Sequence, residues 1–234
     1  CTYTRNDKEY RKDDRKVTLT EACRIVFSDA EQKNKQQGVL CTLKSKDKQL
    51  FNKKVKIHQS IRCPQIASFM YSIASNYQLI LEYPKYWTLH QYIEEHADIP
   101  RLLRYKFCQD VAKAMDYLQH SQIVHRDLST LAVFVFSTDP NDYVNCKLGN
   151  ICSCERTTGN DVTEPIYANQ GENFRMPPEI TSLDSSYTPQ CDVYSYGVLM
   201  FHILTGLINS NPIGESGCVL PQYTRQIPSA LVNI

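Results

Sequence analysis

Residues 123–136 read IVHRDLSTLAVFVF, and this stretch is the most informative one about the fold. It carries the polar triplet His125–Asp127, which follows a long segment of helical periodicity. It ends in the apolar run VFVF at 133–136, which is typical of a short buried strand. The first half therefore holds side chains that can do chemistry, while the second half belongs to a hydrophobic core.

The bulk composition is that of an ordinary globular chain. The 234 residues carry a formal net charge of +1, 42% are hydrophobic and 22% are charged. This length suits one large domain or two lobes. No apolar run reaches the roughly 18 residues that a membrane span needs, and the polar start carries no signal-peptide pattern. We therefore expect a cytoplasmic location.

Ten cysteines are scattered along the chain, which favours a reduced compartment over a disulfide framework. Cys146, Cys152 and Cys154 lie close enough in sequence to raise the question of zinc. The spacing lacks a second CxxC or a histidine pair, so we expect ordinary buried thiols and no metal.

The first third of the chain is rich in strand patterns. Strands are indicated from near Val17 and again after a polar turn at 31–38, and an amphipathic helix is indicated over 48–61. Two further strands are indicated at 69–75 and 77–84, joined by a tight turn at Ser75-Asn76.

From about Trp87 the pattern turns helical. Pro100 begins a helix with one apolar stripe at a 3.6-residue period. Two short strands are expected at 133–136 and 143–148, and a nearly apolar helix runs to Gly206.

Three motifs in this order resemble a eukaryotic protein kinase domain. They are HRDL at 125–128, MPPE at 176–179 and DVYSYGVLM at 192–200, and the resemblance covers roughly Val17 to Gly206. The wording of the last two is most similar to the tyrosine kinase branch. Fold alone does not settle function, so each catalytic part needs its own comparison.

The resemblance implies an α+β, bilobal protein kinase fold. Residues 1–16 form an N-terminal tail, 17–83 a β-rich lobe with one helix, and 84–234 a larger helical lobe that is incomplete at its C-terminus. Phosphoryl transfer in this family depends on positioning and on neutralising phosphate charge.

The phosphate-binding parts of the small lobe are altered. The glycine-rich loop corresponds to Leu19–Val26, where Glu21 and Arg24 replace glycines that would let the backbone approach phosphates. Lys44 matches the family's strand lysine, but Lys54 stands where its helix glutamate belongs. We therefore expect this ion pair to be missing.

The catalytic loop keeps one part and loses others. Asp127 matches the base, whereas Ala132 and Asn150 stand at the two metal-ligand positions. His125–Asp127 can also persist for folding alone, by holding the loop against Asp192. The loss of several such parts would leave very little rate.

The adenine pocket of the family corresponds to Val26, Thr42, Leu81 and Phe134. Phe134 stands where a leucine is common, and we hypothesise that its ring rises into the adenine space. The alternative is that the ring packs down into the helical lobe.

The resulting functional prediction is a catalytically inactive pseudokinase that acts as a scaffold or allosteric partner. It would bind ATP weakly or not at all, hold no magnesium, and contact proteins such as an active kinase or a receptor complex. No nucleic acid is implied, and a membrane tether would lie outside this chain, for instance in a receptor. Tyr167, in EPIYANQ, is a candidate phosphosite.

Two alternatives stay open. One is a weak or atypical ATP-dependent kinase that uses Lys44 and Asp127. The other is a binder of anionic membranes or acidic partners through residues 1–83, which carry 16 Lys and Arg against nine Asp and Glu.

Overall fold

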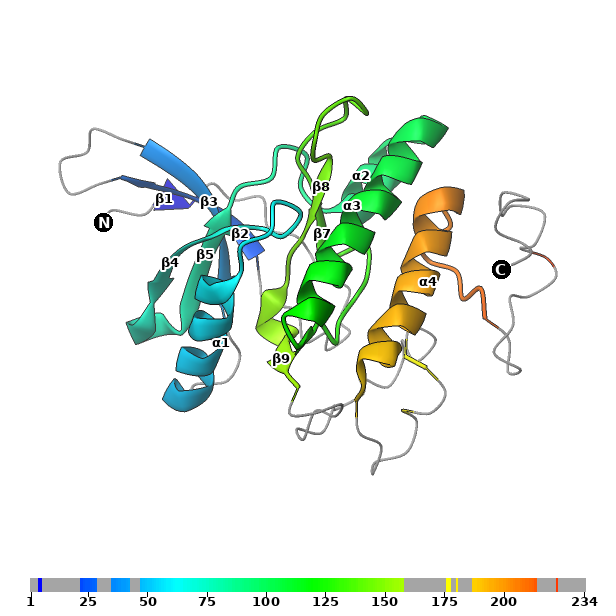
Figure 1. The fold of residues 1–234 in the computed structure, drawn as a ribbon. Helices are drawn as coiled ribbons and strands as arrows, with labels where there is room; N and C mark the ends of the chain where they lie inside the picture. Colours follow the sequence, from blue (N-terminus) through cyan, green and yellow to red (C-terminus); the bar gives the residue numbers. More distant parts are fainter. Residues whose placement is uncertain are drawn as a thin grey trace.

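The computed structural model describes residues 4–5, 22–28, 35–42, 47–157, 176–177, 180, 187–213 and 222. A twisted sheet with one helix forms one side of the molecule, and the described residues of the other side form three helices and two short two-stranded sheets (Figure 1). This is the α+β kinase fold that the sequence predicts.

An antiparallel sheet of five strands builds the small lobe, in the order β1-β2-β3-β5-β4. The strands are β1 (Thr4–Arg5), β2 (Ala22–Ser28), β3 (Lys35–Thr42), β4 (Phe69–Ile73) and β5 (Gln78–Glu82). Val39, Leu79 and Leu81 are at most 1% exposed, so the inner face of the sheet is fully covered.

Two sequence predictions in this sheet need correction, whereas the strand expected from near Val17 is confirmed in part as β2. β2 overlaps the position that the resemblance gives to the glycine-rich loop from Ala22 onward, and that correspondence stays a prediction. The turn predicted at 31–38 is too long, because Lys35–Gly38 belong to β3. The hydrogen bonds between β2 and β3 pair the backbone groups of polar residues as well as those of apolar ones. β1 lies inside the segment predicted as a tail and pairs with Ile25 and Val26.

The predicted small-lobe helix is confirmed as α1 (Lys48–Ser60). Asp47 begins it, because its carboxylate accepts from the backbone N–H groups of Gln49 at 2.7 Å and Leu50 at 3.2 Å. The buried face of α1 presents Phe51, Lys54, Ile57 and His58. Lys54 and His58 are polar, so the buried face of α1 combines apolar packing with polar side chains.

The predicted strand pair after α1 is also confirmed. β4 and β5 are joined by the 3₁₀ turn η1 (Ala74–Asn76), which includes both residues of the predicted Ser75-Asn76 turn. Tyr77 ends this turn in the left-handed region at φ 54°.

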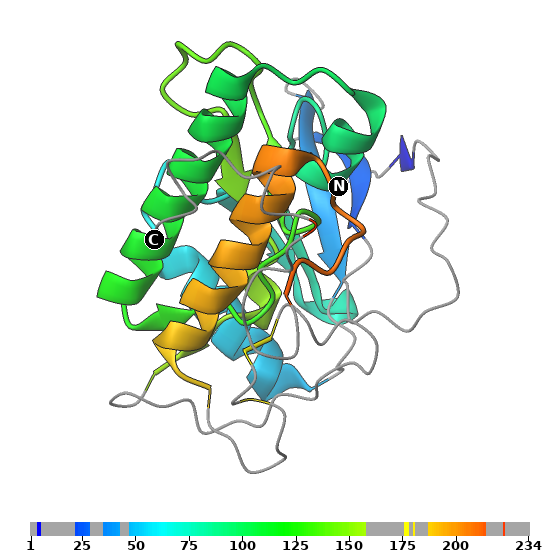
Figure 2. The ribbon, with the colours of Figure 1, turned by 90° about the vertical axis from the view of Figure 1, so that its right-hand side faces the viewer.

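Among the described residues of the large lobe, the helices are α2 (Leu89–Glu95), α3 (Arg101–His120) and α4 (Pro189–Thr205). Figure 2 shows α3 and α4 side by side, and their facing side chains share one apolar core. The predicted end of α4 is confirmed, since Gly206 caps it at φ 79°, a conformation that glycine adopts without strain.

Two short two-stranded sheets lie between the five-stranded sheet and these helices. β6 (Ile123–Val124) pairs with β9 (Glu155–Arg156), and β7 (Val133–Val135) pairs with β8 (Cys146–Leu148). The single 3₁₀ turn η2 (Ile151–Ser153) follows β8. The loop between β6 and β7 and the turn after β8 thus meet at the junction of the lobes.

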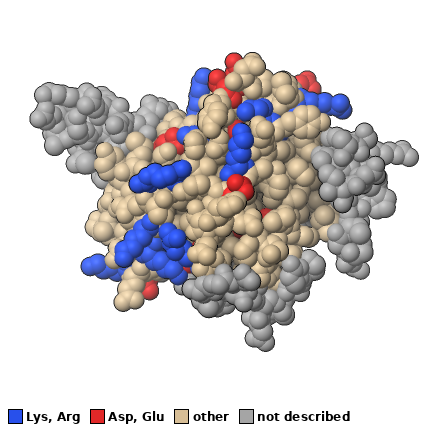
Figure 3. All heavy atoms as spheres, in the orientation of Figure 1, with Lys and Arg blue, Asp and Glu red and all other residues tan. Residues whose placement is uncertain are grey.

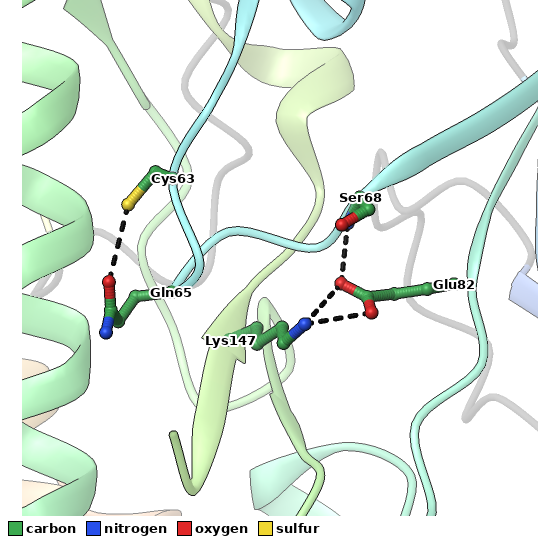
Figure 4. A network of polar contacts seen from close by, with 5 residues as sticks. All are labelled: Cys63, Gln65, Ser68, Glu82 and Lys147. Carbon is green, nitrogen blue, oxygen red and sulfur yellow. Dashed lines mark hydrogen bonds and ion pairs between the residues drawn. The ribbon is translucent and has the colours of Figure 1, made fainter. Parts of the chain in front are cut away.

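A polar network ties the two lobes together (Figure 4). The Nζ of Lys147 in β8 lies 2.7 and 2.8 Å from the carboxylate oxygens of Glu82 in β5. The same carboxylate accepts from the backbone N–H of Ser68 at 2.7 Å. Nearby, Leu148 donates its N–H to the carbonyl of Gln65 at 2.8 Å, so the segment after α1 is joined to the large lobe.

None of the described helices combines the length and the apolar character that a membrane crossing requires.

Candidate active site

The loop between β6 and β7 is anchored by a buried aspartate of α4. Asp192 is 2% exposed and accepts from the backbone N–H groups of His125 at 2.6 Å and Arg126 at 2.9 Å. Tyr187 also donates its hydroxyl to Asp192 at 2.5 Å, and burial followed by this carboxylate raises the pKa of Tyr187 far above its usual range. Arg126 adopts φ 71°, a strained value that these bonds hold in place.

The imidazole of His125 completes this anchoring. It is fully buried, and its Nε2 lies 2.9 Å from the carbonyl oxygen of Gly149. Its Nδ1 accepts the N–H of Asp127 at 3.3 Å. A carbonyl only accepts and an amide N–H only donates, so the ring carries its proton on Nε2. His125 therefore joins the loop to the end of β8.

The candidate base faces a neutral amide. Asn150 Nδ2 donates to Asp127 Oδ2 at 2.6 Å. Asn150 sits in the left-handed region at φ 54°, where asparagine is tolerated better than most residues. One oxygen of the Asp127 carboxylate is thus already bonded within the protein.

The two positions at which the resemblance places metal ligands fit a magnesium ion poorly. Ala132 is fully buried in the large-lobe core and has no side-chain oxygen. Asn150 points its Nδ2 donor group at Asp127. Magnesium prefers several carboxylate, phosphate or water oxygens in near-octahedral geometry, and this donor set does not supply them.

A different ion pair holds α1 to the large lobe. Lys54, with its side chain 7% exposed, points inward and pairs with Glu155 of β9, whose side chain is 1% exposed. Lys54 also donates to the carbonyl of Cys154 at 2.7 Å, and Lys53 reaches the other Glu155 oxygen at 2.7 Å. The expected absence of the Lys44 ion pair stays a prediction, because Lys44 lies outside the described residues. The Glu155 partner of Lys54 lies 101 residues along the chain and was not predicted.

The ionisation of this cluster follows from its burial. Burial raises the pKa of Glu155, but the hydrogen bonds from Lys53 and Lys54 outweigh it and hold that pKa below its usual value. His58, one helical turn after Lys54, is 3% exposed. Burial, and then the Lys54 charge, lower the pKa of His58 to about 3. The cluster therefore contains a lysinium, a carboxylate and a neutral imidazole.

Phe134 belongs to the apolar cluster of the small lobe. Its side chain is 4% exposed and shares this cluster with Val39, Leu79 and Leu81 of the sheet. A Cβ placed on Gly149 would lie 2.2 Å from the ring, so the ring rests directly on the Gly149 backbone. The ring therefore contacts both the sheet of the small lobe and the Gly149 backbone of the large lobe, and its position in the adenine space stays a prediction.

Trp87 extends this aromatic packing and was missed in the sequence. Its ring lies 6.4 Å from that of Phe134 and 5.9 Å from that of Tyr83. Trp87 takes φ 65°, an uncommon value for a bulky residue. No residue pattern signals this, because it follows from how the interlobe linker turns.

The remaining candidate residues are described only in part. Leu81 is 1% exposed beside Phe134, while for Val26 and Thr42 the structure describes the strand backbone alone. Lys44 and Tyr167 lie outside the described residues, as do Glu21 and Glu179.

Two of the three clustered cysteines lie in the core. Cys146 and Cys154 are fully buried, and the side chain of Cys152 is outside the described part. Burial, followed by the nearby Asp110 charge, raises the pKa of the Cys146 thiol well above its usual range. Zinc needs the thiolate form, which this environment disfavours.

Comparison with known protein families identifies a family for this fold. The profile of the family "Protein tyrosine and serine/threonine kinase" matches residues 19–217. This match covers most of the chain, so the protein belongs to the protein kinase family.

Several curated kinases are similar to the chain. The probable serine/threonine-protein kinase roco11 of Dictyostelium discoideum is 29% identical over 163 residues, 68% of this chain and 10% of that protein. Serine/threonine-protein kinase ATG1a of Arabidopsis thaliana is 26% identical over 184 residues, 74% of this chain and 28% of that protein. The human dual specificity testis-specific protein kinase 2 is 27% identical over 154 residues, 65% of this chain and 26% of that protein.

The chain thus spans only about a tenth to a little over a quarter of these relatives. Their names are those of serine/threonine and dual-specificity kinases, so they give no support to the tyrosine branch that MPPE and DVYSYGVLM suggest.

Proposed function

We propose that this kinase-family domain does not transfer phosphate and works through protein contacts. In this role it acts as a scaffold or as an allosteric partner of an active kinase or a receptor complex. It is a pseudokinase that binds ATP weakly or not at all and holds no magnesium.

The position of Phe134 carries the proposal. Its ring is 4% exposed, belongs to the small-lobe apolar cluster and rests on Gly149. The resemblance puts adenine beside this residue, between the lobes. A phenyl ring that already fills the space takes the place of the base and joins the lobes without a ligand.

The charges around the site support the same proposal. Asp127 is bonded by the Asn150 amide, and Ala132 offers no metal oxygen. Lys54 is paired with Glu155 and places a positive charge where the family has a negative one. A phosphate chain with its metal would therefore meet few of the groups that neutralise it elsewhere in the family.

Calorimetric titration with ATP, with and without magnesium, tests this proposal. The unaltered protein should give no saturable heat at millimolar ATP. Phe134→Leu, which restores the residue common in the family, should gain weak binding because the base then has room. Saturable, magnesium-dependent binding to the unaltered protein would overturn the proposal.

A second candidate is a weak or atypical ATP-dependent kinase. It is favoured by the names of the relatives and by the presence of Asp127 at the base position. This candidate requires Lys44, which matches the strand lysine, to contact the nucleotide. It predicts metal-dependent ATP binding that Lys44→Ala abolishes.

Tyr167 adds a further element to the signalling role. Phosphorylation of Tyr167 by another kinase would create a phosphotyrosine with asparagine two residues later, a pattern similar to SH2 docking signals. Recruitment of an SH2 domain by the phosphorylated chain should be lost in Tyr167→Phe. Undiminished recruitment in that variant would exclude the site.

A further inference from the structure

The outward face of α1 concentrates positive charge. Helix α1 contains four lysines and no aspartate or glutamate, and three of these lysines are exposed. Two exposed arginines continue the charge, one just after α1 and one in β9. We call this set the α1 basic face, and it comprises Lys48, Lys53, Lys56, Arg62 and Arg156. Figure 3 shows blue side chains gathered at the lower left, where α1 lies in Figure 1.

Several of these cations are held in position by the fold. Lys53 Nζ lies 2.7 Å from a Glu155 oxygen. Arg156 donates to Ser60 Oγ at 3.0 Å, and Arg62 donates to the carbonyls of Gln59 at 2.7 Å and Ile61 at 2.8 Å. Ordinary solvated lysines and arginines lose considerable side-chain entropy when they bind. Cations that are already ordered lose less, which favours binding at this face.

Among the described residues, the carboxylates near this face do not neutralise it. The Glu155 side chain is 1% exposed and pairs with both Lys53 and Lys54, so this carboxylate is buried below the basic surface and not displayed on it. The Asp47 carboxylate is bonded to two N–H groups at the start of α1. Six cations, the five of the face and Lys54, against these two carboxylates leave four positive charges among the described residues of this region.

The shape of the face favours a protein segment over a membrane. Thirteen helical residues extend about 20 Å, which matches one acidic helix or strand laid along α1. Lipid surfaces commonly take apolar or aromatic side chains together with basic ones. Of the exposed large apolar residues of the described part, Leu102, Tyr105, Tyr143 and Val193 belong to the large lobe, and Tyr71 alone belongs to the small lobe, on β4.

We propose that the α1 basic face is a docking surface for an acidic segment of a partner protein. The inference rests on the proposed function in one respect, since it supplies the partner class of the scaffold. Contact with α1 would also reach the large lobe, because Lys53 and Lys54 join the helix to Glu155 of β9.

Fluorescence anisotropy with a labelled helical peptide that carries glutamates along one face tests this proposal. The triple variant Lys48→Glu, Lys56→Glu, Arg62→Glu spares the buried pair and should bind about tenfold more weakly or worse. The control variant Lys85→Glu, Arg101→Glu, Lys113→Glu has the same net charge with exposed changes on the large lobe. It should bind like the unaltered protein, and both variants should keep the parental melting temperature.

Three outcomes would overturn the docking surface. Equal weakening in both triple variants would mean that only net charge matters. Equal affinity for the peptide and its glutamine counterpart would mean that charge is not recognised. Binding to phosphatidylserine vesicles that requires α1, without peptide binding, would assign the face to a membrane. None of these results bears on ATP binding, so the proposed lack of catalysis is tested separately.

Discussion

The two ends of the loop stretch 125–136 differ in what they retain. At one end, His125 and Arg126 are bonded to Asp192 and Gly149; the His125 bonds are buried and the Arg126 bond is partly buried. At the other end, the methyl group of Ala132 is buried in the large-lobe core, and Phe134 packs into the apolar cluster of the small lobe. The first end fixes the backbone of the loop, whereas the second end would have faced metal and nucleotide.

This contrast separates two requirements that an active kinase meets with the same loop. A buried carboxylate such as Asp192, with three donors, is costly to disrupt whether or not chemistry occurs. A metal ligand has no such structural role, so its replacement by alanine or asparagine leaves the fold intact. An HRD triplet therefore indicates the fold more strongly than it indicates the reaction.

The buried ion pair between α1 and β9 should give the largest effect on stability. Lys54→Met leaves Glu155 buried with only the half-exposed Lys53, and we expect a loss of about 3 kcal/mol in the free energy of unfolding. Urea denaturation measures this. Lys53→Met is the matched control, since its side chain is 45% exposed and its loss should cost under about 1 kcal/mol. Equal losses in the two variants would contradict the buried role of Lys54.

The contact between Gly149 and Phe134 should come next. Gly149→Ala places a Cβ inside the Phe134 ring and should cost about 1–3 kcal/mol. In Phe134→Leu the same substitution should cost clearly less, because the smaller side chain can move away. A double-mutant cycle by urea denaturation gives the coupling between the two positions. Additive effects would mean that the ring does not rest on Gly149.

His58 should make the stability of the protein sensitive to mild acid. Its pKa falls from 6.5 to about 3 on folding, because of burial and then the Lys54 charge. Between these values the unfolded chain binds more protons than the folded one, so stability decreases as the pH falls below 6.5. The slope should approach about 1.4 kcal/mol per pH unit and should vanish in His58→Leu.

Glu155 provides the contrast within the same cluster. Its lowered pKa means that its stabilising contribution is lost only as the pH falls below the usual glutamate range. Of these two groups, His58 is therefore the one that changes the free energy of unfolding in the mildly acidic pH range above the usual glutamate pKa. Retention of the acid sensitivity there in His58→Leu would assign it to another group.

Asp127→Asn should have the smallest effect on stability. Asp127 is partly exposed, and an amide oxygen can still accept from Asn150 Nδ2, so a change within about 0.5 kcal/mol is expected. Thermal melting measures it. A large loss would mean that Asp127 anchors the loop together with His125 and Asp192.

Much of the fold could be predicted because its signals are local. The apolar stripe after Pro100 and the Gly206 cap place α3 and α4 correctly, and the turn at Ser75-Asn76 places β4 and β5. The start of β3 could not be predicted, because Lys35, Gln36 and Gln37 become strand only through pairing with β2.

The chemistry of the site depended on contacts between distant residues. Lys54 could be located on the buried face of α1, but Glu155 lies 101 residues away and nothing in its neighbourhood marks it. The two orientations of Phe134 were equally compatible with the residue pattern. Packing against Leu81 and Gly149 places the ring where the lobes meet, and this packing exists only in the folded protein. Occupation of the adenine space by the ring stays a prediction.

The most direct measurement is transfer of labelled phosphate from magnesium-ATP, to the protein itself and to a general protein substrate. The unaltered chain and Asp127→Asn should be compared from the same preparation. We expect both to give the same background incorporation, because under the proposed function no metal-bound nucleotide lies beside Asp127. Incorporation by the unaltered chain that disappears in Asp127→Asn would contradict the account and establish an active kinase.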